Sequence, residues 1–154
     1  YKRQIVRKFA VAAVLVAVLK LVEFAGVFVM PLLMGAPAPG SDMLEAWLLF
    51  GLGAIGTSLA LLGVMLWLAA VTDSQIVVLA IGVVGGFLGV AALLSPTWLA
   101  TINPFGYFAM LTPFTFGETS ITPTSPHWFA WGTYIITAAA VVTVATRILD
   151  RKEL

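Results

Sequence analysis

Four long apolar stretches, separated by short polar breaks, account for most of the chain. They cover about residues 9–34, 45–70, 76–94 and 127–146. Each is long enough to cross a bilayer core, which takes about 20 mainly apolar residues in a helix. Each must be helical, because lipid offers no partner to an unpaired backbone group, and none shows the alternation of a barrel strand. The pattern predicts an all-α integral membrane protein, with four transmembrane helices in one domain over residues 1–154.

Residues 96–126, between the last two apolar stretches, have a different composition. This segment holds five of the eight prolines and six aromatic residues. A solvated loop is less aromatic, and a spanning helix does not carry Pro104 and Pro113 with Asn103 and Gly106 between them. We expect one or two short helices lying at, or dipping into, the outer membrane face. Such a broken segment covers the bundle, acts as a functional re-entrant element, or binds a partner.

The basic residues predict the orientation. Seven of the eight Lys and Arg residues lie before the first apolar stretch or after the last one, and residues 35–44 and 95–126 contain none. The positive-inside rule therefore places both termini in the cytoplasm, in agreement with an even number of crossings. The polar hinge around Asp73 is then cytoplasmic as well. The expected location is the cell membrane (inner or plasma membrane), as a multi-pass protein.

Composition excludes several classes of protein. Hydrophobic residues make up 61% of the chain and charged residues 10%, with a mean hydropathy of +1.07. Soluble domains carry about 45–50% apolar and about 25% charged residues. A soluble globule, a disordered tail, a coiled coil and a nucleic-acid binder are therefore excluded. The chain has no cysteine, which excludes disulfides, thiolate metal sites and a cysteine nucleophile.

Lys20 and Glu23 interrupt the first apolar stretch near its middle. At a spacing of three residues they share one helix face and can pair. Charged groups at this depth usually face protein or water and often mark a pathway. One interpretation is a substrate or proton site; the other is an internal ion pair that fixes packing. The second is favoured, because no further intramembrane acid or base extends a relay.

Two sets of glycines lie within the predicted helices. Residues 51–56 match a dinucleotide fingerprint as a string, but they follow no strand and lie inside a membrane helix. Gly82, Gly85, Gly86 and Gly89 form two overlapping GxxxG pairs. Small residues at this spacing let helices approach closely. We therefore assign both sets to helix packing.

The remaining polar residues form no recognisable catalytic or cofactor motif. The sequence has no Walker motif, no nucleophile elbow and a single histidine, and its loop acids lie singly in separate loops. The prediction is that this chain has no catalytic residue, no metal site and no bound cofactor, and is not an enzyme.

Three local features resemble the permease subunit of ATP-binding-cassette exporters of the type-2 class. Residues 2–9, KRQIVRKF, are similar to the basic segment that leads into the third helix of that family. The motif Asn103-Pro104-Phe105-Gly106-Tyr107 lies where the family has its broken extracellular segment, and residues 150–154, DRKEL, resemble the family's charged tail. The family has six spans, so the resemblance implies that this chain corresponds to helices three to six.

The resemblance implies a mechanism and partners. The permease would sit in membrane lipid and pair with a second permease copy or a homologous permease. Two cytoplasmic ATPase subunits would bind ATP beneath it, facing Arg3, Arg7, Lys8 and, as a lesser contact, Asp73. Residues 9–34 and 76–94 would flank the pathway, and the segment from Asn103 to Tyr107 would form its outer gate. An amphipathic drug, peptide or lipid is the expected substrate, because the sequence offers no charged groove for a hydrophilic ion.

Two other functions are compatible with the sequence. A small accessory or assembly subunit of a larger membrane complex would use the glycines and the aromatic segment for contacts alone. A membrane-embedded enzyme is disfavoured by the scarcity of intramembrane histidine and paired acids.

Overall fold

The computed structural model describes residues 2–35, 37, 40–72, 74–116 and 121–152. The chain is mostly helical, with one small hairpin between the last two helices. In chain order the elements are α1 (Lys2–Leu33), α2 (Ser41–Val71), α3 (Gln75–Ala92), α4 (Thr97–Ile102), α5 (Tyr107–Leu111), β1 (Phe114–Phe116), β2 (Ile121–Pro123) and α6 (Trp128–Lys152).

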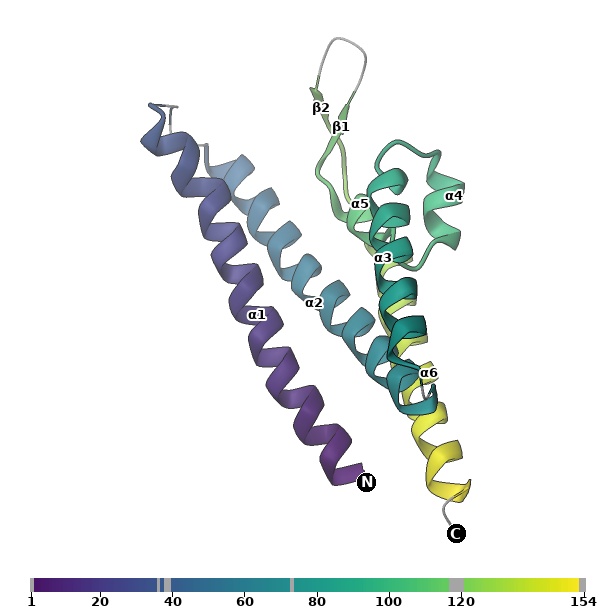
Figure 1. Ribbon diagram of the computed structural model, residues 1–154. Coiled ribbons are helices and arrows are strands. Elements are labelled where there is room, and N and C mark those ends of the chain that lie inside the picture. The colour runs from purple at the N-terminus through teal and green to yellow at the C-terminus, as the bar shows by residue number, and fades with distance from the viewer. Residues whose placement is uncertain (1, 36, 38–39, 73, 117–120, 153–154) are drawn as a thin grey trace.

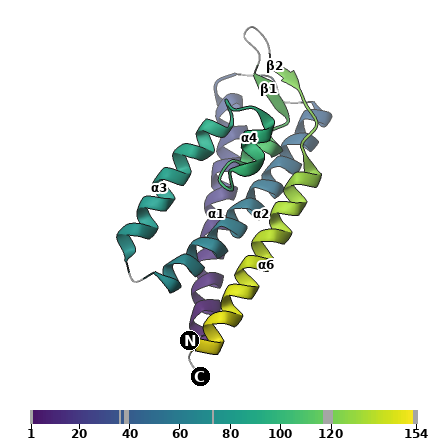
Figure 2. The ribbon, with the colours of Figure 1, turned by 90° about the vertical axis from the view of Figure 1, so that its right-hand side faces the viewer.

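Helix α2 is the centre of the bundle. It packs against α1, α3, α5 and α6, whereas α1 packs chiefly on α2. The long helices run side by side, with the short elements gathered at one end (Figures 1 and 2). The N-terminus of α1 and the C-terminus of α6 lie at the opposite end. The hairpin and the α1–α2 connection thus share one end of the molecule, and both termini share the other.

Glycines in α2 explain how its neighbours come so close. A Cβ added at Gly51 would lie 2.8 Å from the Phe24 ring of α1, and one added at Gly56 would lie 2.9 Å from the Trp131 ring of α6. Both positions therefore need a residue without a side chain. Small residues of this kind let large side chains from other helices reach the backbone.

The same helix receives the short helix α5 at a third glycine. A Cβ at Gly53 would lie 2.8 Å from the Leu111 side chain, which is fully buried. Next to it, the buried Thr57 hydroxyl donates a hydrogen bond to the Gly53 carbonyl at 3.0 Å and accepts one from Trp131 Nε1 at 2.9 Å. Helices α2, α5 and α6 therefore meet around Gly53, with the polar atoms of this contact paired.

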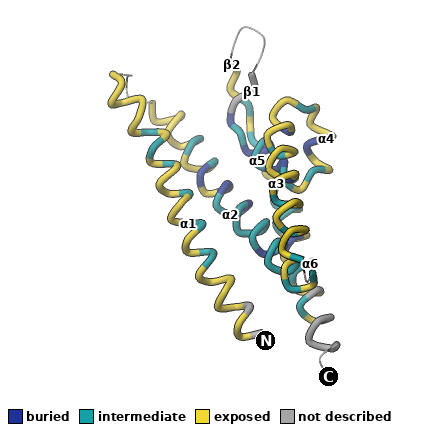
Figure 3. Tube along the Cα trace, viewed as in Figure 1, coloured by how far each residue is buried: buried dark blue, intermediate teal, exposed yellow. Residues whose placement is uncertain are grey.

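Burial is concentrated in the half of the bundle that carries the short helices (Figure 3). The buried hydrophobic residues are Ala54, Ala92, Ala100, Tyr107, Met110, Leu111 and Ala138. None of the described residues of α1 is buried, and α3 exposes most of its large apolar side chains.

Three helices are long and apolar enough to cross a membrane. The qualifying stretches are Val6–Leu33, Ser41–Val71 and Gln75–Ala92, which agree with the first three predicted crossings. Helix α6 contributes a shorter apolar stretch, Trp128–Val144, within the described residues. A multi-pass helical membrane protein is therefore supported, and the fourth crossing stays a prediction.

The segment between α3 and α6 combines two short helices with a hairpin. The helices α4 and α5 match the expected broken segment, with six and five residues. The antiparallel pair β1–β2, in which Phe114 faces Pro123 and Thr115 faces Thr122, was not predicted. The run from Phe114 to Phe116 is too short to show an alternating pattern, so the hairpin is an addition to the one or two short helices that the sequence predicted.

Candidate functional site

The turn between α4 and α5 is built around Asn103. Its Nδ2 donates a hydrogen bond to the Leu88 carbonyl of α3 at 2.8 Å, and its Oδ1 accepts one from the Phe105 N–H at 3.1 Å. The Gly106 N–H donates to the Asn103 carbonyl at 2.9 Å, which closes the turn. A single amide side chain thus fixes the turn internally and ties it to the neighbouring helix. This is how an interrupted backbone keeps its polar groups paired.

Phe105 inserts into α3 at the second glycine pair. A Cβ at Gly89 would lie 2.8 Å from the Phe105 carbonyl oxygen, and a Cβ at Gly85 would collide with the Phe105 ring. Gly85 lies about two turns before the end of α3, or about 10 Å along the helix axis. The Phe105 ring therefore reaches well below the end of the helix, whereas the backbone of the turn lies beside its last turn, at Gly89.

The four glycines of α3 have different surroundings. Gly85 and Gly89 accept the turn, and Gly82 faces the Met65 side chain, 3.5 Å from where a Cβ would be. No atom lies within 4 Å of a Cβ added at Gly86. The structure therefore brings one GxxxG pair against the broken segment and leaves Gly86 open to the surroundings.

Tyr107 anchors the start of α5. Its hydroxyl donates to the Thr101 carbonyl at 2.8 Å, and its ring stacks on Tyr134 of α6 with centroids 4.1 Å apart and planes 15° from parallel. Burial raises the pKa of the Tyr107 phenol, so the group stays protonated and keeps its role as a donor. The predicted gate motif is thus attached to α3 through Asn103 and Phe105 and to α6 through Tyr107.

Lys20 and Glu23 form an ion pair at the middle of α1. Lys20 Nζ lies 2.7 Å from Glu23 Oε2, and the same ammonium lies 5.4 Å from the centroid of the Phe108 ring in α5. A cavity of about 250 Å³ opens beside the pair, walled mainly by aromatic and small residues of α1, α2 and α5. The pair therefore faces the broken segment across a cavity, an arrangement that the sequence did not indicate.

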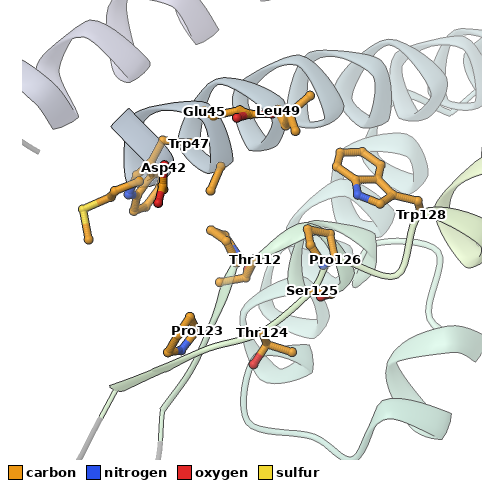
Figure 4. Close-up of a pocket in the computed structure, with 13 residues that line it drawn as sticks. Asp42, Glu45, Trp47, Leu49, Thr112, Pro123, Thr124, Ser125, Pro126 and Trp128 are labelled. Carbon is orange, nitrogen blue, oxygen red and sulfur yellow. The ribbon is translucent and has the colours of Figure 1, made fainter. Parts of the chain in front are cut away.

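A larger groove of about 1100 Å³ lies at the hairpin end (Figure 4). The first turns of α2 form one wall, with the acids Asp42 and Glu45, and the chain from Pro123 to Trp128 forms the other. Sequence analysis missed this groove, because its two walls are about eighty residues apart in the chain.

The predicted ATPase-facing residues lie far from these cavities. Arg3, Arg7 and Lys8 are exposed on the first turns of α1, at the end of the molecule that holds both termini (Figure 1). Asp73 lies outside the described residues. Within the described part of the chain, no three His, Cys, Asp or Glu side chains come together as a metal site would require.

Sequence reasoning also missed Phe108, whose ring lies against the Lys20 ammonium and lines the cavity. Lys20 and Phe108 are distant in the chain, so neither periodicity nor a motif links them. No protein-family model, curated protein or solved structure matches this chain.

Proposed function

We propose that the chain is the membrane-spanning part of an ATP-driven exporter of the ATP-binding-cassette type, corresponding to helices three to six of a type-2 permease. In this proposal the chain crosses the membrane four times, with both termini in the cytoplasm. ATP is hydrolysed by partner subunits, and a second permease copy completes the pathway. The transported molecule is an amphipathic drug, peptide or lipid.

The observation that carries the proposal is the inserted turn between α3 and α6. Asn103 and the Phe105 backbone attach it at Leu88 and Gly89, about one helical turn before the end of α3, and the Phe105 ring reaches Gly85, one turn further. Because the turn joins two short helices, it can shift without breaking a spanning helix. An element of this kind suits an outer gate, which must open and close while the membrane helices stay in place.

The dimensions of α6 support a fourth crossing. Its 25 residues extend about 37 Å at 1.5 Å per residue, more than the roughly 30 Å of a bilayer core. Trp128 stands at one end and Arg147 near the other, the residue types that anchor helices at the two interfaces. The length of α6 and its flanking residues thus favour a membrane crossing, although its apolar stretch is short.

The basic end of α1 suits a docking surface for ATPase subunits. Arg3, Arg7 and Lys8 are exposed, and α1 continues unbroken from them to the Lys20–Glu23 pair. A push on this end is therefore transmitted along a rigid helix to the cavity beside Phe108. Positive charge also favours an acidic partner surface.

Purification and transport assays test the proposal together. The full-length protein, expressed in its own membrane, should co-purify with a nucleotide-binding subunit, and efflux of an amphipathic dye should stop when ATP is depleted. Phe105→Ala should reduce efflux severalfold without loss of the complex, because it removes the ring that holds the turn in α3. Phe129→Ala, at a 91% exposed position, is the matched control and should transport normally. Efflux that continues without ATP, with no nucleotide-binding partner, would contradict the proposal.

A second candidate function follows from the exposed apolar surfaces of α1 and α3. An accessory subunit of a larger membrane complex would cover these surfaces with its partners. In that case Lys20→Leu or Glu23→Leu would reduce the amount of assembled complex and leave the turnover of each remaining complex unchanged. A permease would show the reverse.

A further inference from the structure

The cavity beside Lys20 and Glu23 lies at mid-height of the apolar part of α1. The two residues stand halfway along the apolar stretch Val6–Leu33 of α1. The volume of about 250 Å³ is close to the lower limit of small-molecule sites, which begin at about 300 Å³. The cavity therefore suits one end of an amphipathic molecule rather than a whole large ligand.

The ion pair is unequally exposed. The Lys20 side chain is 30% exposed and lies under the Phe108 ring, whereas the Glu23 side chain is 65% exposed. Among the described residues, Lys20 is the only hydrogen-bond partner of the Glu23 carboxylate. The Glu23 carboxylate is therefore the more accessible member of the pair, and it has acceptor positions free for a group in the cavity.

Aromatic rings form much of the remaining wall. Phe24, Phe50 and Phe108 line the cavity with Trp47, and the Trp47 and Phe50 rings pack edge to face, 5.5 Å apart. The faces of aromatic rings attract cations, most strongly where water is excluded. Phe108 already makes such a cation–π contact, with the Lys20 ammonium.

A carboxylate exposed at this depth is costly in lipid. Lys20 neutralises one side of it, and a second cation would cover the other. We propose that this cavity binds the positively charged head of an amphipathic organic cation, an ammonium or guanidinium group, with Glu23 as its anionic contact and the aromatic rings around it. As a substrate class for the exporter, this assignment rests on the proposed function; as a binding site, it does not.

Three probes of similar shape test the charge preference. Phenyltrimethylammonium, neutral tert-butylbenzene and anionic benzenesulfonate are dialysed against the full-length protein in lipid nanodiscs, with empty nanodiscs as the background. The cation should bind saturably and about tenfold more tightly than the anion or the neutral probe. Equal binding of the three, or preference for the anion, would overturn the proposal without any variant being needed.

Two variants separate a binding site from a structural ion pair. Glu23→Gln should weaken cation binding about tenfold, because it removes the anionic contact. Lys20→Met should strengthen cation binding, because it removes the competing ammonium and keeps the length of the side chain. A pair that only fixes packing would move both variants in the same direction, or neither. Glu45→Gln, in the separate groove at the hairpin end, is the matched control and should leave cation binding unchanged.

Transport then separates this inference from the proposed function. If the cation binds with the stated preferences but is not exported in an ATP-dependent way, the site stands and the exporter proposal fails. If ATP-dependent export of amphipathic cations occurs and Glu23→Gln leaves both binding and export unchanged, the exporter proposal stands and the site fails.

Discussion

Helix α1 and the broken segment α4–α5 differ in regularity and in burial, and the two properties do not go together. Helix α1 is 32 residues long and strongly apolar, yet none of its described residues is buried. The two short helices are flanked by prolines and separated by a break in the helical backbone. They nevertheless supply Ala100, Tyr107, Met110 and Leu111 to the buried core. In this protein the short helix α5 and Ala100 of α4 are packed inside, whereas the long regular helix α1 stays exposed to the surroundings.

The difference follows from the bilayer as a solvent. Apolar side chains gain little by leaving lipid for a protein interior, so long apolar helices remain exposed at no great cost. A broken backbone gains much more from burial, because its free N–H and C=O groups find partners only in protein. Which residues are buried in a membrane protein therefore depends on backbone hydrogen bonding and on side-chain packing more than on hydropathy.

Of the substitutions that test this difference, Gly89→Ala should cost the most stability. The new Cβ would meet the Phe105 carbonyl, a backbone atom that cannot move without disturbing the turn. We expect a loss of about 3 kcal/mol in the free energy of unfolding, measured by detergent titration in mixed micelles. Gly86→Ala meets no atom and should be neutral or gain up to about 1 kcal/mol from helix propensity. Equal effects of the two substitutions would show that the turn is not seated in α3.

Leu111→Ala should have the second largest effect. Leu111 is fully buried against Gly53, so truncation leaves a cavity between α5 and α2. The unfolded helix remains in an apolar medium, so the substitution removes mainly packing contacts. We expect a loss of about 2 kcal/mol in the free energy of unfolding, measured by the same titration. Leu15→Ala in α1, at a 59% exposed position, should change stability by less than about 0.5 kcal/mol. If Leu15→Ala cost as much stability as Leu111→Ala, packing of α1 would matter as much as packing of α5, contrary to this interpretation.

Asn103→Leu should have a smaller but more specific effect. It removes the hydrogen bonds to the Leu88 carbonyl and from the Phe105 N–H. We expect about 1.5 kcal/mol of lost stability and faster hydrogen exchange at the Phe105 amide, measured by mass spectrometry. Thr101→Val is the control, because its hydroxyl donates to the Thr97 carbonyl within α4. An unchanged exchange rate in the Asn103 variant would show that the amide does not hold the turn.

Much of this architecture was predictable from the order of apolar runs and breakers. The first three long helices follow from apolar length alone, and Pro104 with Gly106 marked the interruption between α4 and α5. Helix α1 begins earlier than its apolar run, because the basic residues before it are good helix formers outside the membrane.

Other features depend on contacts between distant parts of the chain. Periodicity identified Gly85 and Gly89 as positions of close approach, but not Phe105 as the residue that fills them. The contact between Lys20 and Phe108 has no local signature. Pairing of β1 with β2 depends on backbone hydrogen bonds between the two strands, which three-residue strands do not reveal in sequence.

In the proposed topology, Thr97 and Ser125 lie on the same side of the membrane. Because the chain has no cysteine, single cysteines at Thr97, Ser125 and Ser74 can be labelled in intact cells with a membrane-impermeant maleimide. We expect Thr97→Cys and Ser125→Cys to react from outside, and Ser74→Cys to react only after permeabilisation. Labelling of positions 97 and 125 from opposite sides would show instead that the chain crosses the membrane between them.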